Sequence, residues 1–239
     1  MSKHLHRIAS PEIYPIFKKE SHYVVKTNPG PHPKNKSIPL MLILRDMLKI
    51  TKTAKESKRI LNLRNVKIDQ KVRTDGKFPV GLMDVITILD KNYRFIFDDK
   101  GKIKLVRISE KEANIKPCKI KYKKIVKGGK IQLNLHDGRT ILVNDNKYKP
   151  GDTIIIELPS QKIKEHLPFG KDMLVYISDG KHIGEIAKIV EFKPIPGSNP
   201  DRVILSMINR DATFETLKKY TFLVGKEKPE IKLHGEERE

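Results

Sequence analysis

Residues 45–85 carry the sequence RDMLKITKTAKESKRILNLRNVKIDQKVRTDGKFPVGLMDV, and this stretch decides the fold expected for the first half of the chain. Thr53 followed by Glu56 is a capping-box pattern, which predicts that a helix begins there. Residues 65–69 alternate with the period of a strand, Gln70-Lys71 is the expected turn, and a return strand is expected from Val72. The stretch therefore predicts a helix followed by a strand pair.

A second helix is expected just upstream. After Pro39, apolar residues recur at the three- and four-residue spacing of an amphipathic helix up to Leu48, which leaves Arg45 and Lys49 on the outer face. The two helices and the hairpin can gather the basic residues of this region on one concave side. Such a surface suits the backbone of a bent RNA helix.

Strand patterns dominate the remainder of the chain, with turns such as Asp98–Gly101, Gly128-Gly129 and Asp137-Gly138 between them. One strand carries Lys119, Lys121 and Lys123 in alternation with apolar residues, which predicts a lysine ladder on one face and core on the other. The segment 159–168 is expected to be a spacer. The expected strands cover 85–89, 93–97, 103–108, 119–127, 130–135, 139–143, 153–158, 173–177, 184–190, 203–207, 213–216 and 220–224.

Composition points to a polyanionic partner. The chain has 49 Lys plus Arg and 29 Asp plus Glu in 239 residues, a net charge of +20. Such a field attracts nucleic acid and releases counterions on contact. A membrane-surface protein, a histone-like DNA binder and a merely soluble basic protein are the rival interpretations. The lone Cys118 excludes an intramolecular disulfide framework, so a reducing cytoplasm is expected, and no apolar run suggests a membrane partner.

The expected fold class is α+β and multidomain. Residues 1–40 are expected to form an extended basic arm broken by prolines, which would order against RNA or against the protein itself, and 226–239 are expected to form a mobile tail. Between them lie a helix-pair plus hairpin RNA-binding domain (41–95), a central antiparallel β domain (96–166) and an SH3-like β-barrel (167–225).

Five blocks of sequence stand out, in order along the chain. They are Lys3-His4-Leu5 with Arg7, Ala9 and Pro11, followed by Gly30-Pro31-His32; Lys67–Asp75 with Pro79, Gly81, Met83, Asp84 and Val85; Glu112-Ala113 with Lys116, Cys118 and Lys119; His136–Ile141; and Gly170, Gly180, Gly184 and Ile186, which resemble a KOW motif. Together these blocks resemble one known family, the e-type (archaeal and eukaryotic) small-subunit ribosomal protein S-four, and the resemblance covers about residues 3–233.

The resemblance implies an S-four-like RNA-binding domain, a central β domain and a KOW-containing barrel, docked on small-subunit ribosomal RNA beside neighbouring ribosomal proteins in the cytoplasm. The chain ends soon after Ile231, whereas eukaryotic members carry a longer tail, so an archaeal-type protein is expected. The implied function is that of a structural component of the small ribosomal subunit. A dissociable RNA-binding translation or ribosome-assembly factor is the alternative, because KOW-bearing barrels also occur in elongation factors.

Enzymatic activity is not expected. S-four-like modules also occur in RNA-modifying enzymes, but the chain carries no Walker loop, dinucleotide fingerprint, nucleophile elbow or paired cysteine motif. The histidines of the arm lack the spacing of a zinc site, and His136-Asp137 precedes a glycine and is interpreted as a turn. No catalytic residue, cofactor, metal or small-molecule substrate is therefore predicted.

Basic residues are the predicted contacts, through phosphates rather than through bases. Single-strand base stacking is disfavoured, because tryptophan is absent and the basic helices carry no aromatic stripe. The predicted RNA-binding residues are Lys3, His4, Arg7, Arg45, Lys49, Lys52, Lys55, Lys58, Arg59, Lys67, Lys71, Arg73, Lys119, Lys121, Lys123, Lys181 and Lys188.

Overall fold

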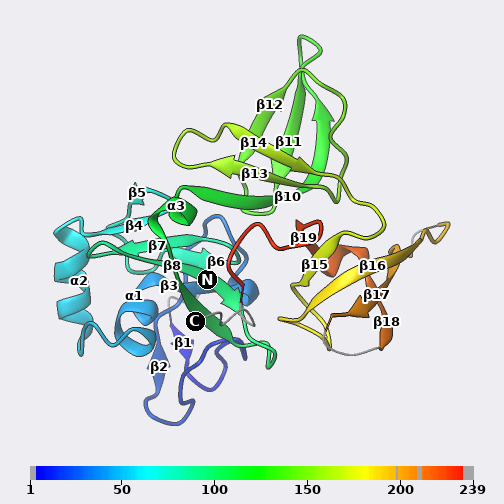
Figure 1. Ribbon diagram of the computed structural model, residues 1–239. Coiled ribbons are helices and arrows are strands. Elements are labelled where there is room, and N and C mark those ends of the chain that lie inside the picture. The colour runs from blue at the N-terminus through cyan, green and yellow to red at the C-terminus, as the bar shows by residue number, and fades with distance from the viewer. Residues whose placement is uncertain (1–3, 198, 209–211, 234–239) are drawn as a thin grey trace. The chain divides into compact units, whose positions relative to one another are not determined.

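The computed structural model describes residues 4–197, 199–208 and 212–233 (Figure 1). Antiparallel sheets dominate it, and its helices are few and short. The chain forms two compact units. The first contains Met1–Ile96 and Lys102–Asn114, and the second contains Phe97–Gly101 and Ile115–Glu239. No helix among the described residues is long and apolar enough to cross a membrane.

The main sheet of the first unit has the strand order β5-β4-β7-β8-β9. The expected turn at Gln70-Lys71 is wrong by one residue, because Lys71 already pairs with Ile68. Asp69 and Gln70 form the turn with φ values of 50° and 62°, the left-handed geometry of a two-residue hairpin loop. The strands are β4 (Val66–Ile68), β5 (Lys71–Val72), β7 (Val85–Ile88), β8 (Lys91–Phe97) and β9 (Ile103–Ile108).

Both expected helices are present beside this sheet. The first is α1 (Leu40–Leu42), which continues as the π-helix η2 (Ile43–Met47), and its buried side is fully apolar. The second is α2 (Ala54–Asn62), with the predicted capping box at its start. The π-turn was not foreseen, because apolar spacing indicates which face is buried but not which carbonyl each N–H selects.

The N-terminal segment is held by contacts within the first unit. β1 (Leu5–His6) pairs with β2 (Tyr23–Val24), and β3 (Ser37–Pro39), which follows the 3-10 helix η1 (Lys34–Lys36), pairs with β6 (Pro79–Gly81). His32 Nε2 lies 3.0 Å from the Asp84 carboxylate, and both side chains are buried. This buried pair connects two of the sequence blocks that carry the family resemblance.

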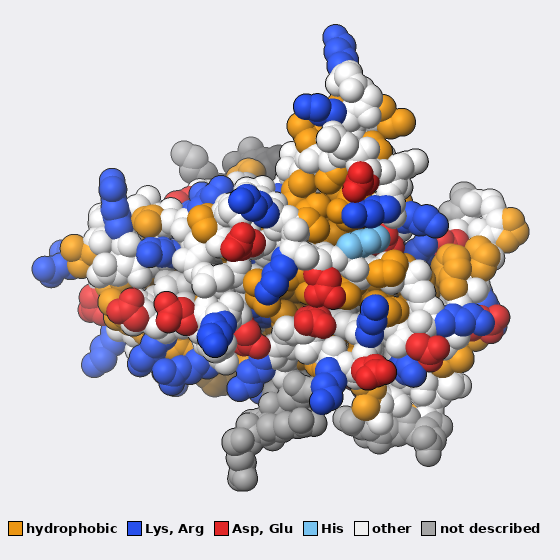
Figure 2. Space-filling view, turned by 45° about the horizontal axis from the view of Figure 1, so that its top comes forward, with side chains coloured by type: hydrophobic (Ala, Val, Ile, Leu, Met, Phe, Trp, Pro, Cys, Tyr) orange, Lys and Arg blue, Asp and Glu red, His pale blue; other side chains and the backbone are white. Residues whose placement is uncertain are grey.

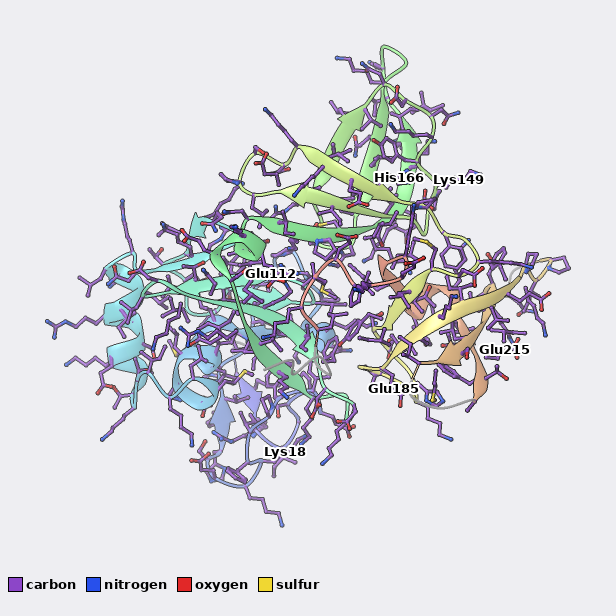
Figure 3. All side chains as sticks on the ribbon, in the orientation of Figure 1. Lys18, Glu112, Lys149, His166, Glu185 and Glu215 are labelled. Atoms are coloured by element: carbon purple, nitrogen blue, oxygen red, sulfur yellow. The ribbon has the colours of Figure 1, made fainter. Side chains whose placement is uncertain are left out.

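A short helix is hydrogen-bonded to the main sheet of the first unit. α3 (Glu110–Ala113) begins at Ser109, whose side chain accepts a hydrogen bond from the Glu112 N–H. Arg94 of β8 is fully buried and donates a hydrogen bond of 2.9 Å from Nη2 to the Glu112 carbonyl oxygen, and Figure 3 labels Glu112 at this helix. Burial lowers the pKa of Arg94 to about 10, although the charges of Glu112 and Asp69 raise it. Arg94 therefore stays cationic and fixes α3 to the sheet.

The second unit contains two five-stranded sheets, with the orders β12-β11-β10-β13-β14 and β18-β17-β16-β15-β19. Residues expected to be a spacer include strand β14, in which Lys164 and Glu165 are both exposed and the pairing with β13 contains a register shift. The strands are β10 (Ile115–Ile125), β11 (Ile131–Leu135), β12 (Thr140–Val143), β13 (Thr153–Glu157), β14 (Ile163–Leu167), β15 (Leu174–Ile177), β16 (Ile186–Lys193), β17 (Arg202–Met207), β18 (Thr213–Leu217) and β19 (Thr221–Gly225), with the 3-10 helix η3 (Lys218–Tyr220) before β19.

The two sheets of the second unit share one hydrophobic core. Ile155 of β13 and Leu167 of β14 pack in the same buried cluster as Val175, Ile189 and Leu205 of the second sheet. Tyr176 adds a buried polar anchor, because its hydroxyl accepts from the Phe97 N–H at 2.8 Å and donates to the Phe97 carbonyl oxygen at 2.9 Å. Burial raises the pKa of Tyr176, so it stays a neutral phenol that can do both.

The lysine ladder predicted on β10 is wrong, because a β-bulge interrupts the strand between Ile120 and Tyr122. An extra residue at a bulge reverses which face each following side chain takes. Ile120 is fully buried, whereas Tyr122, expected in the core, is 69% exposed. Lys123 instead shares the inner face with the buried Leu133 across from it.

We expect Gly184→Ala to destabilise the protein by about 2–3 kcal/mol, whereas Gly129→Ala should cost about 1 kcal/mol. Both glycines have positive φ, of 87° and 71°. A Cβ at Gly184 would lie 2.4 Å from the backbone oxygen of Asp98, while one at Gly129 would meet nothing within 4 Å. Urea unfolding of the two variants measures the difference. Equal losses would contradict this close backbone approach.

Candidate nucleic-acid interface

The start of α2 is fixed by a reciprocal cap. The Glu56 N–H donates to the Thr53 hydroxyl at 3.2 Å, and the Glu56 carboxylate accepts from the Lys52 N–H at 2.9 Å. The hydrogen bond from the Lys52 backbone is the main cause that lowers the pKa of Glu56, so this carboxylate stays ionised at the positive end of the helix dipole. The cap sets where the helix begins, and thereby which residues face outward.

The inner side of α2 is held by Ser57 and Leu61, one helical turn apart and both fully buried. The Ser57 hydroxyl lies 2.7 Å from that of the buried Thr51 and donates to the Thr53 carbonyl oxygen. The spacing of Lys55, Lys58 and Arg59 places them on one outer face, and all three are exposed. We name these three residues the α2 basic face. Figure 2 shows lysine and arginine side chains projecting over the visible surface of the molecule.

The residues before α2 differ in how freely they present charge. Arg45 is only partly exposed and pairs with Asp46 at 2.9 Å. Lys49 is exposed and takes a left-handed backbone conformation with φ of 52° just after η2, and Lys52 is exposed at the cap of α2. Arg64 follows α2, is exposed, and was not among the predicted contacts although the same basic stretch contains it.

The hairpin β4–β5 divides its three predicted basic residues between two faces. Residues directly opposite each other in an antiparallel pair project to the same face. Lys67 is opposite Val72, whereas Lys71 is opposite the buried Ile68. Lys67 and Lys71 are exposed, while the Arg73 guanidinium is partly buried and lies 4.3 Å from the centroid of the Phe78 ring. The structure therefore does not gather the three on one surface.

The predicted contacts in the N-terminal segment have different environments. Lys3 lies outside the described residues. His4 is exposed, and its ring centroid lies 5.5 Å from that of Tyr23. Arg7 is 3% exposed, and its guanidinium donates to the Phe17 carbonyl oxygen, the Ser21 hydroxyl and the Glu20 carboxylate. Its donors are thus used inside the first unit.

The predicted lysines of β10 also differ in their hydrogen bonds and exposure. Lys119 Nζ donates to backbone carbonyl oxygens of Lys218, Lys219 and Thr221, and Lys123 Nζ donates to Asn146 and to the Tyr148 carbonyl oxygen. Lys121 is exposed. Two lysines predicted to bind RNA therefore hold segments of the second unit together. Lys124, which was not predicted, is exposed.

The last two predicted residues lie in the second sheet of the second unit. Lys181 is exposed in the turn between β15 and β16. Lys188 of β16 is half exposed and pairs with the still more exposed Asp172 at 2.9 Å. An exposed pair of this kind is worth little in water, so Lys188 can exchange its partner for a phosphate.

The structure also brings together groups that resemble chemical sites. Cys118, His136 and Asp137 are the group among the described residues that could hold a metal ion. Lys116 and Arg139, 3.0 Å and 3.1 Å from the Asp137 carboxylate, already supply positive charge there, which disfavours a divalent cation.

A histidine–carboxylate pair in the second unit is structural. His166 Nε2 lies 2.8 Å from Asp152, whose carboxylate also accepts from the backbone N–H groups of Lys149 and Phe169. Figure 3 shows His166 and Lys149 close together at this turn. Backbone donors occupy the carboxylate, so the pair fixes loops rather than activating a nucleophile.

Comparison with known proteins identifies the family. The model for ribosomal family S4e matches residues 89–163, and that for the RS4NT domain matches residues 1–35. Small ribosomal subunit protein eS4 of Methanocaldococcus jannaschii is 45% identical, with 97% of each chain covered, and that of Methanothermobacter thermautotrophicus is 42% identical, with 98% of this chain and 96% of the relative covered.

A solved structure agrees with the sequence comparison. The crystal structure of the 30S ribosomal protein S4e from Thermoplasma acidophilum superposes with a TM-score of 0.70 at 34% identity, covering 81% of this chain and 97% of that chain. The match extends across most of both chains, so fold and sequence lead to the same family. The chain belongs to the eS4 family of small ribosomal subunit proteins.

Proposed function

We propose that this protein is a structural component of the small ribosomal subunit that binds and stabilises folded ribosomal RNA through the α2 basic face. Family membership supports the ribosomal role and agrees with the expectation that the chain is not an enzyme. The observation that carries the binding proposal is the arrangement of Lys55, Lys58 and Arg59, all exposed on one side of a helix whose other side is anchored.

The binding mode we propose is electrostatic and independent of base sequence. Lysine and arginine side chains on a helix contact phosphates, and each contact releases counterions from the RNA. Lys49, Lys52 and Arg64 flank the α2 basic face in sequence and are exposed, so they extend the same positive field. Arg7, Lys119 and Lys123 fall outside the proposed surface, because internal acceptors occupy their charged groups.

The finer division of the chain is also a proposal. An S-four-like RNA-binding domain at 41–95 is supported by the helix pair and the β4–β5 hairpin. A KOW-containing SH3-like barrel at 167–225 is supported by the order of the five strands from β15 to β19 and by the positive φ of Gly180 and Gly184 in its first turn. A central β domain at 96–166 would supply most of the other sheet of the second unit.

The partners we propose are small-subunit ribosomal RNA and neighbouring small-subunit ribosomal proteins, with the ribosome placing the protein in the cytoplasm. A dissociable translation or assembly factor is the competing function. The buried contacts of the N-terminal segment, such as those of Arg7 and His32, do not separate the two roles. The two roles differ instead in how strongly the protein is attached to the assembled subunit.

Binding of the full chain to purified ribosomal RNA tests this proposal. We expect a linear fall in the logarithm of the association constant with the logarithm of salt concentration, and a preference for small-subunit over large-subunit RNA of the same source. Filter binding across a salt series measures both. Equal affinity for the two RNAs would contradict a dedicated small-subunit role.

A further inference from the structure

The outer face of the β10–β11–β12 sheet is a small, ordered grid of side chains. After the bulge in β10, Tyr122 is opposite Asn134, which is opposite Thr140; two residues along, Lys124 is opposite Gln132, which is opposite Leu142. Directly opposed residues share a face of the sheet, so all six project outward together. We name this surface the Tyr122 face; its members are Tyr122, Lys124, Gln132, Asn134, Thr140 and Leu142.

The Tyr122 face is open to solvent, whereas the reverse side of the same strands is buried at Leu133 and Ile131 and becomes exposed only toward the end of β10, where Ile125 is 72% exposed. Tyr122 is 69% exposed and Leu142 is 58% exposed, while Leu133 and Ile131 on the reverse side are 0% and 6% exposed. Lys124 and Thr140 are exposed as well. Tyr122 and Leu142 are therefore large, solvent-exposed side chains on one face of the sheet, where a partner can contact them.

The polar groups of the Tyr122 face offer both a donor and an acceptor beside the tyrosine ring. Gln132 Nε2 donates to Asn134 Oδ1 at 2.8 Å. This bond orients the two amides and does not use the carbonyl oxygen of Gln132 or the amide hydrogens of Asn134. A nucleobase presents the same combination of donors and acceptors along its edges.

The positive charge around the Tyr122 face favours RNA over protein as the partner that binds there. Residues 116–130 contain seven lysines and no acidic residue, and Lys121, Lys124, Lys127 and Lys130 are exposed. Lysine is depleted at protein–protein interfaces, whereas lysine beside an exposed aromatic ring on a sheet is the composition that binds single-stranded RNA. Figure 2 shows basic side chains at the outer end of this sheet.

We infer that the Tyr122 face binds an unpaired nucleotide of RNA, whose base stacks on the Tyr122 ring while its edge meets Asn134 and Gln132 and Lys124 contacts a phosphate. This inference rests on the proposed function, and it adds a base-stacking site where the sequence had disfavoured one. The α2 basic face would then hold helical RNA by charge, and the Tyr122 face a single-stranded segment by stacking.

Substitution of Tyr122 in the full chain tests the inference. Tyr122→Leu removes the ring but keeps an apolar side chain, and loss of one base–aromatic stack predicts a fall in affinity for a single-stranded RNA of about eight nucleotides by about 5- to 150-fold. Tyr122→Phe keeps the ring and should bind nearly as the wild type does. Affinity for a duplex of the same sequence should be unchanged in both variants.

The matched control is Phe17→Leu, because Phe17 is 83% exposed but lies outside the Tyr122 face. This control should not change single-strand affinity. Thermal unfolding of Tyr122→Leu should match the wild type, since the replaced ring is exposed. If Tyr122→Leu binds the single strand as well as the wild type does, the inference is overturned, while small-subunit RNA binding by the same protein leaves the proposed function intact.

Crosslinking from residue 122 in assembled small subunits gives a second, independent answer. A photoreactive phenylalanine derivative at this position should crosslink to ribosomal RNA. A crosslink to a neighbouring ribosomal protein instead would show that this face is a protein docking surface and would overturn the inference. Absence of the whole protein from the subunits would contradict the proposed function rather than the site.

Discussion

Replacing Lys116 with methionine is expected to lower the free energy of unfolding by about 3–5 kcal/mol. The Lys116 side chain is 0% exposed and its Nζ lies 3.0 Å from the Asp137 carboxylate, which is 1% exposed. Removing the ammonium leaves an ionised carboxylate buried without its fully buried cationic partner, and the partly exposed Arg139 guanidinium, 3.1 Å away, remains as its ion-pair partner. Urea unfolding of the two proteins measures the loss.

Two control variants make this prediction specific. Lys147→Met removes an ion pair with Asp145 whose side chains are 57% and 67% exposed, and it should leave the free energy of unfolding nearly unchanged. The double variant Lys116→Met/Asp137→Asn removes both charges and should recover part of the stability lost by the single variant. A loss at Lys116 no larger than at Lys147 would contradict a buried, energetically important pair.

The Lys116–Asp137 pair also predicts how the free energy of unfolding changes at low pH. Burial opposes ionisation of Asp137, but the charges of Lys116, His136 and Arg139 outweigh it and hold the pKa well below the usual 3.8. A carboxyl group with a depressed folded-state pKa stabilises the protein fully above its unfolded pKa, and this contribution is lost as pH falls through the folded pKa. The wild type should therefore lose stability below about pH 4, and the Lys116→Met variant should lose less over the same range.

Reversing the charge of the whole α2 basic face is the second large effect. We expect Lys55→Glu/Lys58→Glu/Arg59→Glu to weaken binding to small-subunit ribosomal RNA on the order of several hundredfold at about 0.1 M salt, because each lost phosphate contact costs nearly tenfold there. The slope of the logarithm of the association constant against the logarithm of salt concentration should become shallower, by the amount expected for about three lost phosphate contacts. Filter binding over a salt series measures both quantities, and thermal unfolding should change little because the three side chains are exposed.

A charge-matched control separates local contact from net charge. Lys162→Glu/Lys164→Glu/Lys171→Glu changes the net charge equally, but these exposed lysines are interspersed with Glu157, Glu165 and Asp172. The positive electrostatic field of these lysines is therefore weaker than that of the α2 basic face, and the control variant should lose far less affinity for the RNA. If the two triple variants lose equal affinity, only the overall charge matters and the α2 basic face is not the contact surface.

The sequence predicted the elements whose signal is local. The capping box at Thr53 and Glu56 marked the start of α2 because both partners of that cap lie within one turn. Most strands were predicted because alternation and glycine turns are also short-range patterns. Strand β14 was missed because its central Lys164 and Glu165 are both exposed, so few apolar residues marked it.

The candidate contact residues were harder to predict, because position along the chain does not reveal which partner a long side chain reaches. Lys119 resembled a surface lysine, but its acceptors are carbonyl oxygens about one hundred residues away. The bulge after Ile120 reversed the expected faces of Tyr122 and Lys123. Such a bulge depends on pairing with β11, which a single strand's pattern does not contain.

The copy number of this protein per small ribosomal subunit, after gradient sedimentation with and without a wash at about 0.5 M salt, tests the central claim most directly. Such a wash strongly screens exposed electrostatic contacts, so it removes loosely attached proteins. A structural component should remain at about one copy per subunit after the wash. Loss of the protein to the light fractions would contradict this account and would instead identify a dissociable factor.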